Sequence, residues 1–580
     1  MLKHLGKSGI KYLTNIFNKS VNTAIIPTVW KTARIIPLLK PSKPSDQGPS
    51  YRPISLLSPA AKILEKILLP EISQAANLQS HQHGFRKLHS TTTALQEMST
   101  YITNGLNMNK PVKRTVAVAI DLSRAFDTVD HNILLDDINN LQLNQHLKRF
   151  LCSYLRGRVT YVEFRGSRSK FRKMKQGVPQ GGVLSPLLFN IYMTKMPTPP
   201  NHMKLTTYAD DSTVLNSGEA DSNFDHKELS AELNSYLNIL FLWFKARNLE
   251  ISPTKSTATI FTTAPNEAGL DLPIYINGTK VPTVQKPKIL GVTLDNLFNF
   301  SEHANQMKSK IGQRNNVLKA LSGTTWGKEK ETLLSTYKAT SQSILNYCAP
   351  IWGPNLCKSK FEELQRQQNT ALRTTTGCVK MTGIDHLHSE CEIMPVKDHC
   401  YMLSKQFLLA SQLPEHPNNI DLHTPHTGRI MKKTLKTRFG EEIKQIIPPS
   451  GHTKDIHKAK IKQIHTKSVR DSIARQEPNP VLGFPAPKVN VTEKELPRQT
   501  RTRLAQLRSG YSSNLNSYLS RIREDTDDIC PDCNAPNHTT NHLFNCPSKP
   551  TPLTALSLWT NPKDAATFLG LPGQEFDDHG

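Results

Sequence analysis

The chain has 580 residues, more than one hydrophobic core usually supports, and 73 Lys and Arg against 48 Asp and Glu give it a formal net charge of +25. This surplus predicts a polyanionic partner, and the lack of a long apolar run, leader peptide or lipidation signal argues against a membrane protein. Nine mostly dispersed cysteines suit a reducing, intracellular compartment better than a disulfide framework.

The first ninety residues alternate helix and strand patterns. Residues 1–26 are basic and weakly amphipathic, which predicts a helix. Residues 30–41 predict a strand closed by prolines, and residues 51–57 predict a second strand after a polar loop. Residues 60–69 predict a helix that ends at Pro70.

Two later segments predict strands that carry carboxylates. Residues 115–120 form a β-branched run that should be a buried strand with Asp121 at its end. Asp210 and Asp211 lie between two short β-prone runs, which predicts a hairpin with both carboxylates at its turn. A solvated Asp-Asp turn is the plain alternative. Three carboxylates on neighbouring strands are what two Mg²⁺ ions need to activate a hydroxyl and stabilise a leaving pyrophosphate.

Between and after these strands lie a loop, a long helix and a basic region. Residues 176–186 contain three glycines and two prolines, which by themselves predict only an ordinary turn. Residues 229–246 have the apolar spacing of a helix, and residues 300–413 are helical in pattern. Residues 425–503 are rich in Lys, Arg, Pro and His and poor in large apolar residues, which predicts a partly disordered basic linker.

Several of these motifs together resemble a known family. Residues 208–211, preceded by residues 121–130, resemble the palm of reverse transcriptases. The order and sequence of these motifs are most similar to those of jockey-like retrotransposons without long terminal repeats. The resemblance runs from about residue 30 to the cysteine cluster near the C-terminus. It implies an α+β fold of the right-hand polymerase type, with fingers and palm built on an antiparallel sheet, a helical thumb and a small zinc-type cluster. The domains expected are 1–29 (N-terminal helix), 30–300 (fingers and palm), 301–424 (thumb), 425–525 (basic linker) and 526–580 (zinc-knuckle-like segment and tail).

The resemblance also assigns site residues. Asp121, Asp210 and Asp211 would be catalytic and would hold two Mg²⁺ or Mn²⁺ ions. The nucleotide and template contacts implied are Arg52 (triphosphate), Arg86 (phosphate or base), Phe126 (exclusion of a 2′-hydroxyl), Gln180 and Gly181 (nucleotide seat) and Lys255 (leaving pyrophosphate). The plain alternatives are a core position for Phe126 and a solvated surface charge for each lysine, including Lys40 and Lys43 beside Arg52.

A cysteine and histidine cluster closes the chain. Cys530 and Cys533 precede His542 and Cys546, a spacing that suits a tetrahedral Zn²⁺ site, and His538 competes with His542 as the fourth ligand. Such a site would hold together a segment too short to build a core.

The function expected is an RNA-directed DNA polymerase that uses an RNA template, a DNA primer or target and deoxynucleoside triphosphates, with target-primed reverse transcription in the nucleus, or activity in the cytoplasm, and no membrane partner. One alternative is a decayed or co-opted copy that binds RNA without polymerising; another is a reverse transcriptase of the group II intron or retron type. Related full-length elements carry an upstream endonuclease, which this chain is too short to include, so we expect a truncated product or a separately encoded endonuclease.

Overall fold

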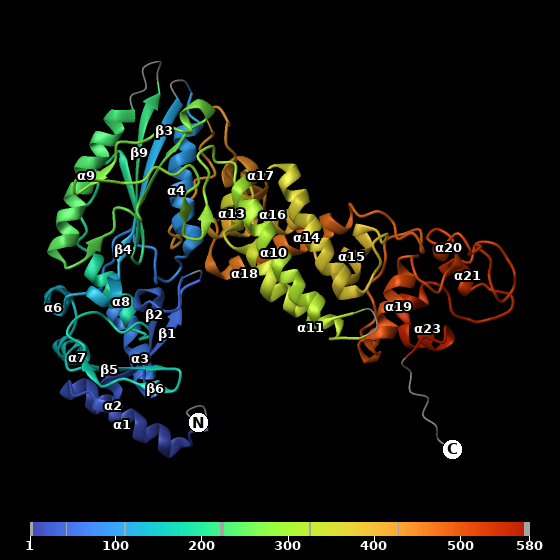
Figure 1. Cartoon of the computed structure of the whole chain (residues 1–580), viewed down its shortest axis with the longest axis horizontal. Helices are drawn as coiled ribbons and strands as arrows, with labels where there is room; N and C mark the ends of the chain where they lie inside the picture. The colour runs from blue at the N-terminus through green and yellow to red at the C-terminus, as the bar shows by residue number, and fades with distance from the viewer. Residues whose placement is uncertain are drawn as a thin grey trace.

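The computed structural model describes residues 4–41, 43–109, 112–220, 226–323, 326–426, 428–448 and 451–572. Figure 1 shows three parts in chain order: a mixed helix and sheet body, a body of long helices, and a smaller C-terminal unit. No helix in these ranges is both long and apolar enough to cross a bilayer.

A four-stranded antiparallel sheet forms the centre of the first body. Its order is β11 (Thr257–Phe261), β3 (Val112–Ile120), β9 (Asp211–Ala220) and β8 (Met203–Tyr208). Alternate residues of β3 face opposite layers. Val116 and Val118 pack in the cluster of helix α9 (His226–Ala246), whereas Ala117 packs in the cluster of helix α4 (Thr91–Leu106). The sheet is therefore covered on both faces (Figure 1).

A second, more exposed sheet lies beside the first. Strand β1 (Thr32–Leu39) pairs with β2 (Tyr51–Leu56) in antiparallel and with β5 (Val159–Phe164) in parallel orientation, and β6 (Ser167–Arg168) and β7 (Arg172–Lys173) extend β5. The helices of this region are α1 (Lys7–Thr23), α2 (Thr28–Lys31), α3 (Pro59–Ala75), α5 (Ala125–Thr128), α6 (His131–Asn139), α7 (Gln145–Leu155) and α8 (Ser185–Met193). Helix α3 continues past Pro70, where we predicted its end, because Leu68 and Ile72 on either side of the proline are buried in the core.

Short strand pairs connect the sheets to the helices. They are β4 (Leu122–Ser123) with β10 (Glu250–Ile251), β12 (Tyr275–Ile276) with β13 (Thr279–Lys280), and β14 (Lys288–Ile289) with β15 (Val292–Thr293). The helical body contains α10 (Ser301–Leu321), α11 (Lys330–Tyr337), α12 (Ser343–Asn346), α13 (Ala349–Trp352), α14 (Lys358–Thr376), α15 (Ile384–Cys391) and α16 (Val396–Ala410).

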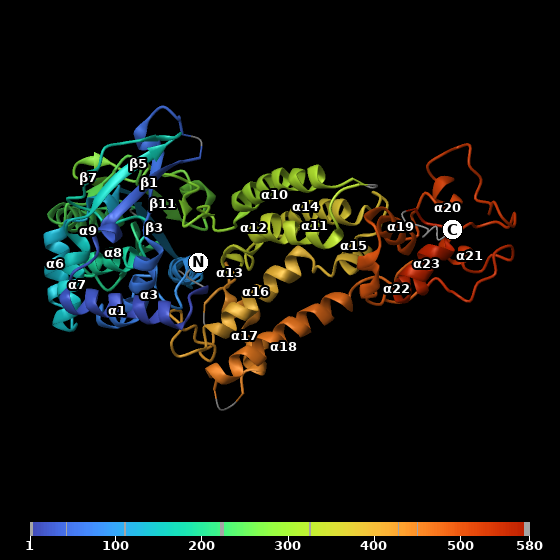
Figure 2. The same ribbon diagram turned by 90° about the horizontal axis from the view of Figure 1, so that it is seen from below.

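Residues 425–525, predicted to be a partly disordered basic linker, contain packed helices instead. They are α17 (Leu435–Ile446), α18 (Lys454–Ile473) and α19 (Arg498–Arg508). Helices α17 and α18 pack with α16, as Figure 2 shows. Leu435, Phe439 and Ile443 of α17 are buried, and their spacing of four residues puts them on one face. The few apolar residues of this basic segment are thus placed where they can pack.

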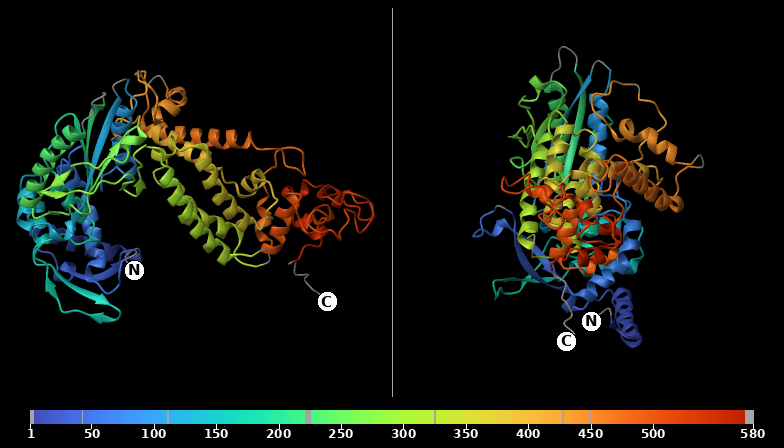
Figure 3. Two further views of the ribbon diagram at one scale, coloured as in Figure 1. Left: turned by 45° about the horizontal axis from the view of Figure 1, so that its top comes forward. Right: turned by 90° about the vertical axis from the view of Figure 1, so that its right-hand side faces the viewer.

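The C-terminal unit has an apolar core, so the segment after residue 526 does not depend on a metal alone. Helices α20 (Asn516–Leu519), α21 (Thr540–Leu543), α22 (Ser557–Thr560) and α23 (Pro562–Phe568) follow α19. Leu504 and Leu507 of α19 pack with Phe544, Leu558 and Trp559. Figure 3 shows this unit at the end of the helical body that is remote from the sheets. The tail 573–580 lies outside the described residues.

A buried charge network joins the unit to the helical body. Arg508 of α19 is fully buried and donates hydrogen bonds to Glu390 at 3.0 Å, to Glu493 and to the carbonyl of Leu558. Lys330 of α11 lies 2.8 Å from Glu390 and 3.2 Å from Glu493. Because buried charges are tolerated only when they are paired, this network fixes how α19 sits against α11 and α15.

Candidate active site and metal centre

The three predicted aspartates lie at one end of the central sheet, because Asp121 follows β3 and is followed by β4, and Asp210 and Asp211 lie where β8 turns into β9. Figure 1 labels β4 at this end of the sheet. Tyr208 pairs with Asp211, so Ala209 and Asp210 form a two-residue turn between β8 and β9. Ala209 has a φ of 57°, a left-handed conformation that L-residues seldom adopt, and such conformations collect at functional sites. Ile120 pairs with Ser212, which places Asp121, one residue later, beside Asp211.

The charges of neighbouring aspartates affect the pKa values of Asp210 and Asp211. Burial and the charge of Asp121 raise the pKa of Asp210, whereas the Arg52 guanidinium opposes the rise. Burial, together with repulsion from Asp210 and Asp121, raises the pKa of Asp211 to about 6. Carboxylates that perturb one another in this way are stabilised by a cation, and oxygen ligands suit Mg²⁺ or Mn²⁺.

Two serines hold the backbone of Asp121, and sequence reasoning missed them. The Ser256 hydroxyl accepts a hydrogen bond from the Asp121 N–H at 3.1 Å and donates one to the Ser252 carbonyl at 2.8 Å. The Ser252 N–H donates to the Asp121 carbonyl at 2.8 Å. Ser256 is fully buried. The loop between β10 and β11 therefore fixes the end of β3, and Lys255 lies exposed on that loop.

An edge segment at residues 81–84 supports the aspartate turn from the other side. The His83 N–H donates to the Thr207 carbonyl, and the Thr207 N–H donates to the His81 carbonyl, each at 2.8 Å. A Cβ on Gly84 would lie 2.5 Å from the Ala209 nitrogen, so no other residue fits there without displacing the turn. Gly84 thus allows residues 81–84 to lie close against the aspartate turn.

Arg86 and Phe126 have protein partners in the structure. The Arg86 guanidinium donates to the carbonyls of Gln79 at 2.7 Å and Gln82 at 3.1 Å, which ties it to its own loop. The half-buried ring of Phe126 stacks on Phe189 with centroids 4.4 Å apart. Phe85, which is 57% exposed, meets Phe126 edge-on at 6.4 Å, so an aromatic surface adjoins the aspartate turn.

The glycine-rich loop bridges the two sheets. The Ser55 N–H of β2 donates to the Gln180 carbonyl at 2.7 Å, and the Gln180 side chain donates to Asp127 at 2.9 Å. Gly181 has a φ of 127°, and a Cβ there would lie 2.5 Å from the Ser55 carbonyl oxygen. The loop is therefore held between β2, which carries exposed Arg52, and the segment that follows Asp121.

Buried Glu65 of α3 fixes the start of α8. Its carboxylate accepts hydrogen bonds from the N–H groups of Val183 at 2.6 Å and Leu184 at 3.0 Å. A carboxylate at a helix N-terminus satisfies donors that have no partner within the helix. No sequence spacing signals this contact, because Glu65 lies 118 residues before Val183.

The C-terminal cluster brings together four potential ligands. The ligand atoms of Cys530, Cys533, His542 and Cys546 all lie within 4.8 Å of one another, and among the described residues this is the one Cys, His, Asp or Glu group that does so. The carboxylate oxygens of the three aspartates are not all within 4.8 Å of one another, although the residues are adjacent. His538 is not in the group, because its Nδ1 accepts a hydrogen bond from the Asn516 N–H.

The turn that carries Cys530 and Cys533 has a defined backbone. The Cys530 N–H donates to the Ala535 carbonyl at 2.9 Å, the Asn534 N–H donates to the Cys530 carbonyl at 3.0 Å, and Asn534 has a φ of 58°. Although burial opposes ionisation, hydrogen bonds from backbone and neighbouring ligands lower the pKa of Cys530 to about 7, which favours the thiolate that a metal needs.

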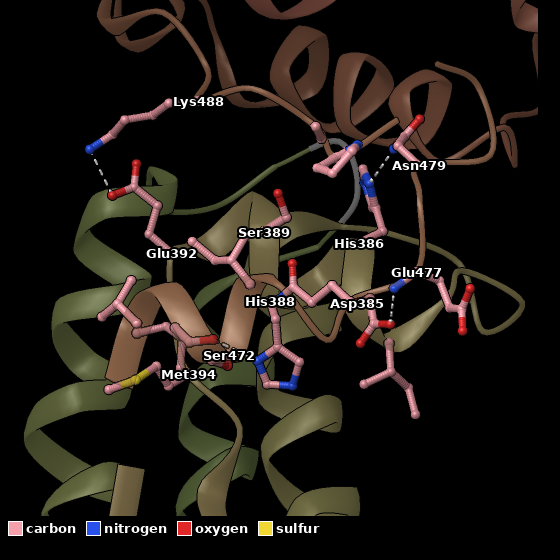
Figure 4. Close-up of a pocket in the computed structure, with 18 of the residues that line it drawn as sticks. Asp385, His386, His388, Ser389, Glu392, Met394, Ser472, Glu477, Asn479 and Lys488 are labelled. Atoms are coloured by element: carbon pink, nitrogen blue, oxygen red, sulfur yellow. Dashed lines mark hydrogen bonds and ion pairs between the residues drawn. The ribbon is translucent and has the colours of Figure 1, made fainter. Parts of the chain in front are cut away.

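A separate cavity of about 1100 Å³ lies between α15, α18 and residues 476–488. Figure 4 shows its lining, in which Lys488 pairs with Glu392, Asn479 contacts His386 and the Glu477 N–H donates to Asp385. No predicted site residue lines it. Its size therefore does not make it the reaction site.

Comparison with known proteins agrees with this geometry. Residues 40–294 match the family model described as "Reverse transcriptase (RNA-dependent DNA polymerase)", so the chain carries a reverse transcriptase domain. The chain is 31% identical over 414 residues to the probable RNA-directed DNA polymerase from transposon BS of Drosophila melanogaster. That alignment covers 68% of this chain and 44% of the relative. It is 25% identical over 462 residues to the RNA-directed DNA polymerase from mobile element jockey of the same species. That alignment covers 77% of this chain and 48% of the relative. The predicted resemblance to jockey-like elements is confirmed, and the chain spans about half the length of these relatives.

Among solved structures, the telomerase of Candida tropicalis is a distant match. The identity is 12% and the TM-score 0.38, over 80% of this chain and 65% of that one. A likeness this weak carries no argument about function.

Proposed function

We propose that the chain is an RNA-directed DNA polymerase that extends a primer 3′-hydroxyl on an RNA template by two-metal nucleotidyl transfer. The observation that carries the proposal is the meeting of Asp121, Asp210 and Asp211 at one sheet end, where repulsion and burial raise the pKa values of Asp210 and Asp211. The donors are all carboxylates, which fit Mg²⁺ or Mn²⁺. Two such ions bound here would activate the hydroxyl and stabilise the leaving pyrophosphate.

The arrangement of elements supports a right-hand polymerase. The central sheet with α4 and α9 would be the palm, and the sheet of β1, β2 and β5 would be the fingers, together over residues 30–300 after an N-terminal helical segment at 1–29. The thumb would be the helical body from residue 301. Because α17 and α18 pack on α16, we place them with the thumb rather than in a linker that starts at residue 425.

The side chains around the carboxylates suit a nucleotide. Arg52 lies near enough to Asp210 to affect its pKa, so its guanidinium fork would grip a triphosphate bound beside the aspartates. Phe126 would guard the sugar from the aromatic surface it shares with Phe85. Gln180 and Gly181, anchored to β2, would seat the nucleotide.

Two further cations have more modest roles. Lys255, exposed on the loop that fixes Asp121, would protonate the leaving pyrophosphate. Arg86 acts first as a support for its own loop, since its guanidinium bonds two carbonyls, and would reach nucleic acid only with the donors that remain.

The C-terminal cluster fits structural Zn²⁺. Three thiols and one imidazole are the soft donor set that zinc prefers, and the Cys530 turn presents both of its thiols on one side. Cys530, Cys533, His542 and Cys546 would hold the metal as a zinc knuckle, with His538 buried nearby in a structural role.

The biological setting follows from the relatives named above. We propose target-primed reverse transcription in the nucleus, with an RNA template, a DNA target and deoxynucleoside triphosphates as partners. The alternative, an RNA-binding copy without polymerase activity, is disfavoured because the three carboxylates and their backbone supports are all present.

The test is primer extension by the purified chain on an RNA template with deoxynucleotides and Mg²⁺ or Mn²⁺. A DNase-sensitive product that depends on the metal supports the proposal. RNA binding without any extension in either metal would favour the alternative.

A further inference from the structure

A second basic site lies in the helical body, away from the aspartates. A cavity of about 360 Å³ opens between residues 354–361 around the start of α14, the N-terminal half of α16 and residues 431–438 around the start of α17. Figure 2 shows α13, α16 and α17 side by side in this region. The five cations that line it are Lys358, Lys397, Lys432, Lys433 and Arg438. We call this cavity the basic pocket.

The charges of the basic pocket have no counter-charge within it. All of its lining residues are described, and none of them is Asp or Glu. Arg438 donates to the Pro354 carbonyl at 2.9 Å and to the Tyr401 hydroxyl, and its guanidinium lies 4.6 Å from the Tyr401 ring centroid. These partners fix the guanidinium without neutralising it. The one ion pair of Lys358, with Glu362 at 3.9 Å, lies on the exposed side of α14.

Two asparagines hold the central lysines in place. The Asn107 side chain accepts from the Lys432 N–H at 2.7 Å and donates to the Lys432 carbonyl at 2.8 Å. Asn355 makes the same pair of bonds to Lys433, at 2.8 and 2.7 Å. Burial lowers the pKa of Lys432, and the negative charge of Asp295, which does not line the pocket, offsets this only in part. The asparagines thus fix the backbone of both lysines, and the partly desolvated ammonium group of Lys432 shares the pocket with other cations, an arrangement that an anionic ligand would stabilise.

The helix that begins at the pocket adds to its positive potential. Helix α14 starts at Lys358 with Cys357 as its N-cap, and its first turn has no acidic residue. The free N–H groups of a helix N-terminus favour an anion.

We propose that the basic pocket binds a backbone phosphate of a nucleic acid strand at a position outside the aspartate site. Phosphate is the group that several converging cations and a guanidinium recognise. The ring of Tyr401 is covered by Arg438 and meets Phe361 edge-on at 5.8 Å, which leaves no free aromatic face for a base. Binding is therefore independent of sequence. The inference rests on the proposed function only in taking the polyanion to be nucleic acid.

Cys357 offers a direct probe, because it is the exposed one of the nine cysteines and lines the pocket. Hydrogen bonds from Ser359 and the backbone lower its pKa, which favours the reactive thiolate. The measurement is the rate of Cys357 alkylation by iodoacetamide, followed by peptide mass mapping, with and without a saturating single-stranded RNA. We expect the RNA to slow the alkylation several-fold.

A pair of charge-matched variants separates the pocket from the general positive charge. Lys397→Gln/Lys433→Gln removes two exposed lysines of the pocket, and Lys458→Gln/Lys462→Gln removes two exposed lysines of α18. The first should abolish the protection of Cys357 and reduce the slope of log affinity against log salt by about 1. The second should preserve the protection.

Three results would overturn the proposal: an alkylation rate unchanged by RNA, equal effects of the two double variants, or protection by inorganic phosphate but not by RNA. The last would mean a site for free phosphate. In the Asp210→Asn variant, RNA should protect Cys357 as it does in the unmodified chain. A failure of this site and a failure of the polymerase assignment can therefore be told apart.

Discussion

The aspartate site should weaken the fold when no divalent ion is present. Burial and repulsion from Asp210 and Asp121 raise the pKa of Asp211 from its ordinary 3.8 to about 6. Ionised Asp211 therefore destabilises the folded chain, and Asp211→Asn should stabilise the metal-free protein while it abolishes extension. Such a trade of stability for activity is expected where a site serves chemistry rather than folding.

The magnitude follows from the size of the pKa change. At 1.36 kcal/mol for each tenfold change in proton affinity, the change corresponds to about 3 kcal/mol. Although neighbouring protein atoms partly desolvate the Asp211 carboxylate, the residue keeps a large exposed surface, so solvent screening reduces this to about 1 kcal/mol, or about 2–4 °C in Tm.

The sign of the pH dependence follows from linkage. The pKa is higher in the folded state, so the folded chain binds the extra proton between about pH 4 and about pH 6. The stability contribution of Asp211 therefore falls as the pH rises through that window and stays low above it. The advantage of Asp211→Asn should be full at neutral pH and vanish near about pH 4.

The assay is calorimetric unfolding without added Mg²⁺, with hydrogen exchange in β3 and β9 to assign the transition to the first body. Asp46→Asn, at an exposed loop position, is the matched control and should change stability by less than about 0.5 kcal/mol. Added Mg²⁺ should stabilise the unmodified chain more than Asp211→Asn. A variant that is equally or less stable than the unmodified chain at neutral pH would refute the reasoning.

Further predictions concern the sugar, the backbone support, the buried network and zinc. Phe126→Val should admit ribonucleotides, and an unchanged ratio of ribonucleotide to deoxynucleotide incorporation would count against the gate. Ser256→Ala leaves the half-buried Asp121 N–H without its partner, so it should cost about 1–2 kcal/mol and lower kcat more than KM in extension assays. Arg508→Met should cost about 3–5 kcal/mol in chemical unfolding, because Glu390 loses a buried partner. Cys546→Ser should lower the zinc content measured by atomic absorption and expose residues 526–560 to protease, while extension on short templates persists.

The strand end and the turn that carry the three aspartates could be predicted from the sequence, whereas the residues that support them could not. β-branched runs and turn residues are local signals, so the hairpin at Asp210 and the strand before Asp121 could be predicted from a few residues each. The contacts of Ser256 with Asp121, and of Glu65 with the start of α8, join residues far apart in the chain and follow no periodicity. The same holds for Gly84. Only the folded structure shows that a side chain at this position would clash with the Ala209 turn.

The error in the basic region has a different cause. We predicted a partly disordered linker from the amino-acid composition of residues 425–503 as a whole, and composition does not show where the few apolar residues lie. The apolar spacing of Leu435, Phe439 and Ile443 was visible in the sequence and would have predicted α17. Only Ile464 and Ser472 of helix α18 are buried, so the helix has no apolar stripe in its sequence. Its position depends on packing with α16, which the local sequence does not predict.

The central claim, that carboxylates from two strands act as one metal site, is tested most directly by primer extension on RNA with Asp121→Asn and Asp210→Asn, measured beside RNA affinity at moderate salt. We expect extension to disappear in both variants and affinity to change less than about twofold, because binding rests on dispersed positive charge. Extension by Asp121→Asn at a rate near that of the unmodified chain would contradict the claim, as would a parallel loss of RNA binding in either variant.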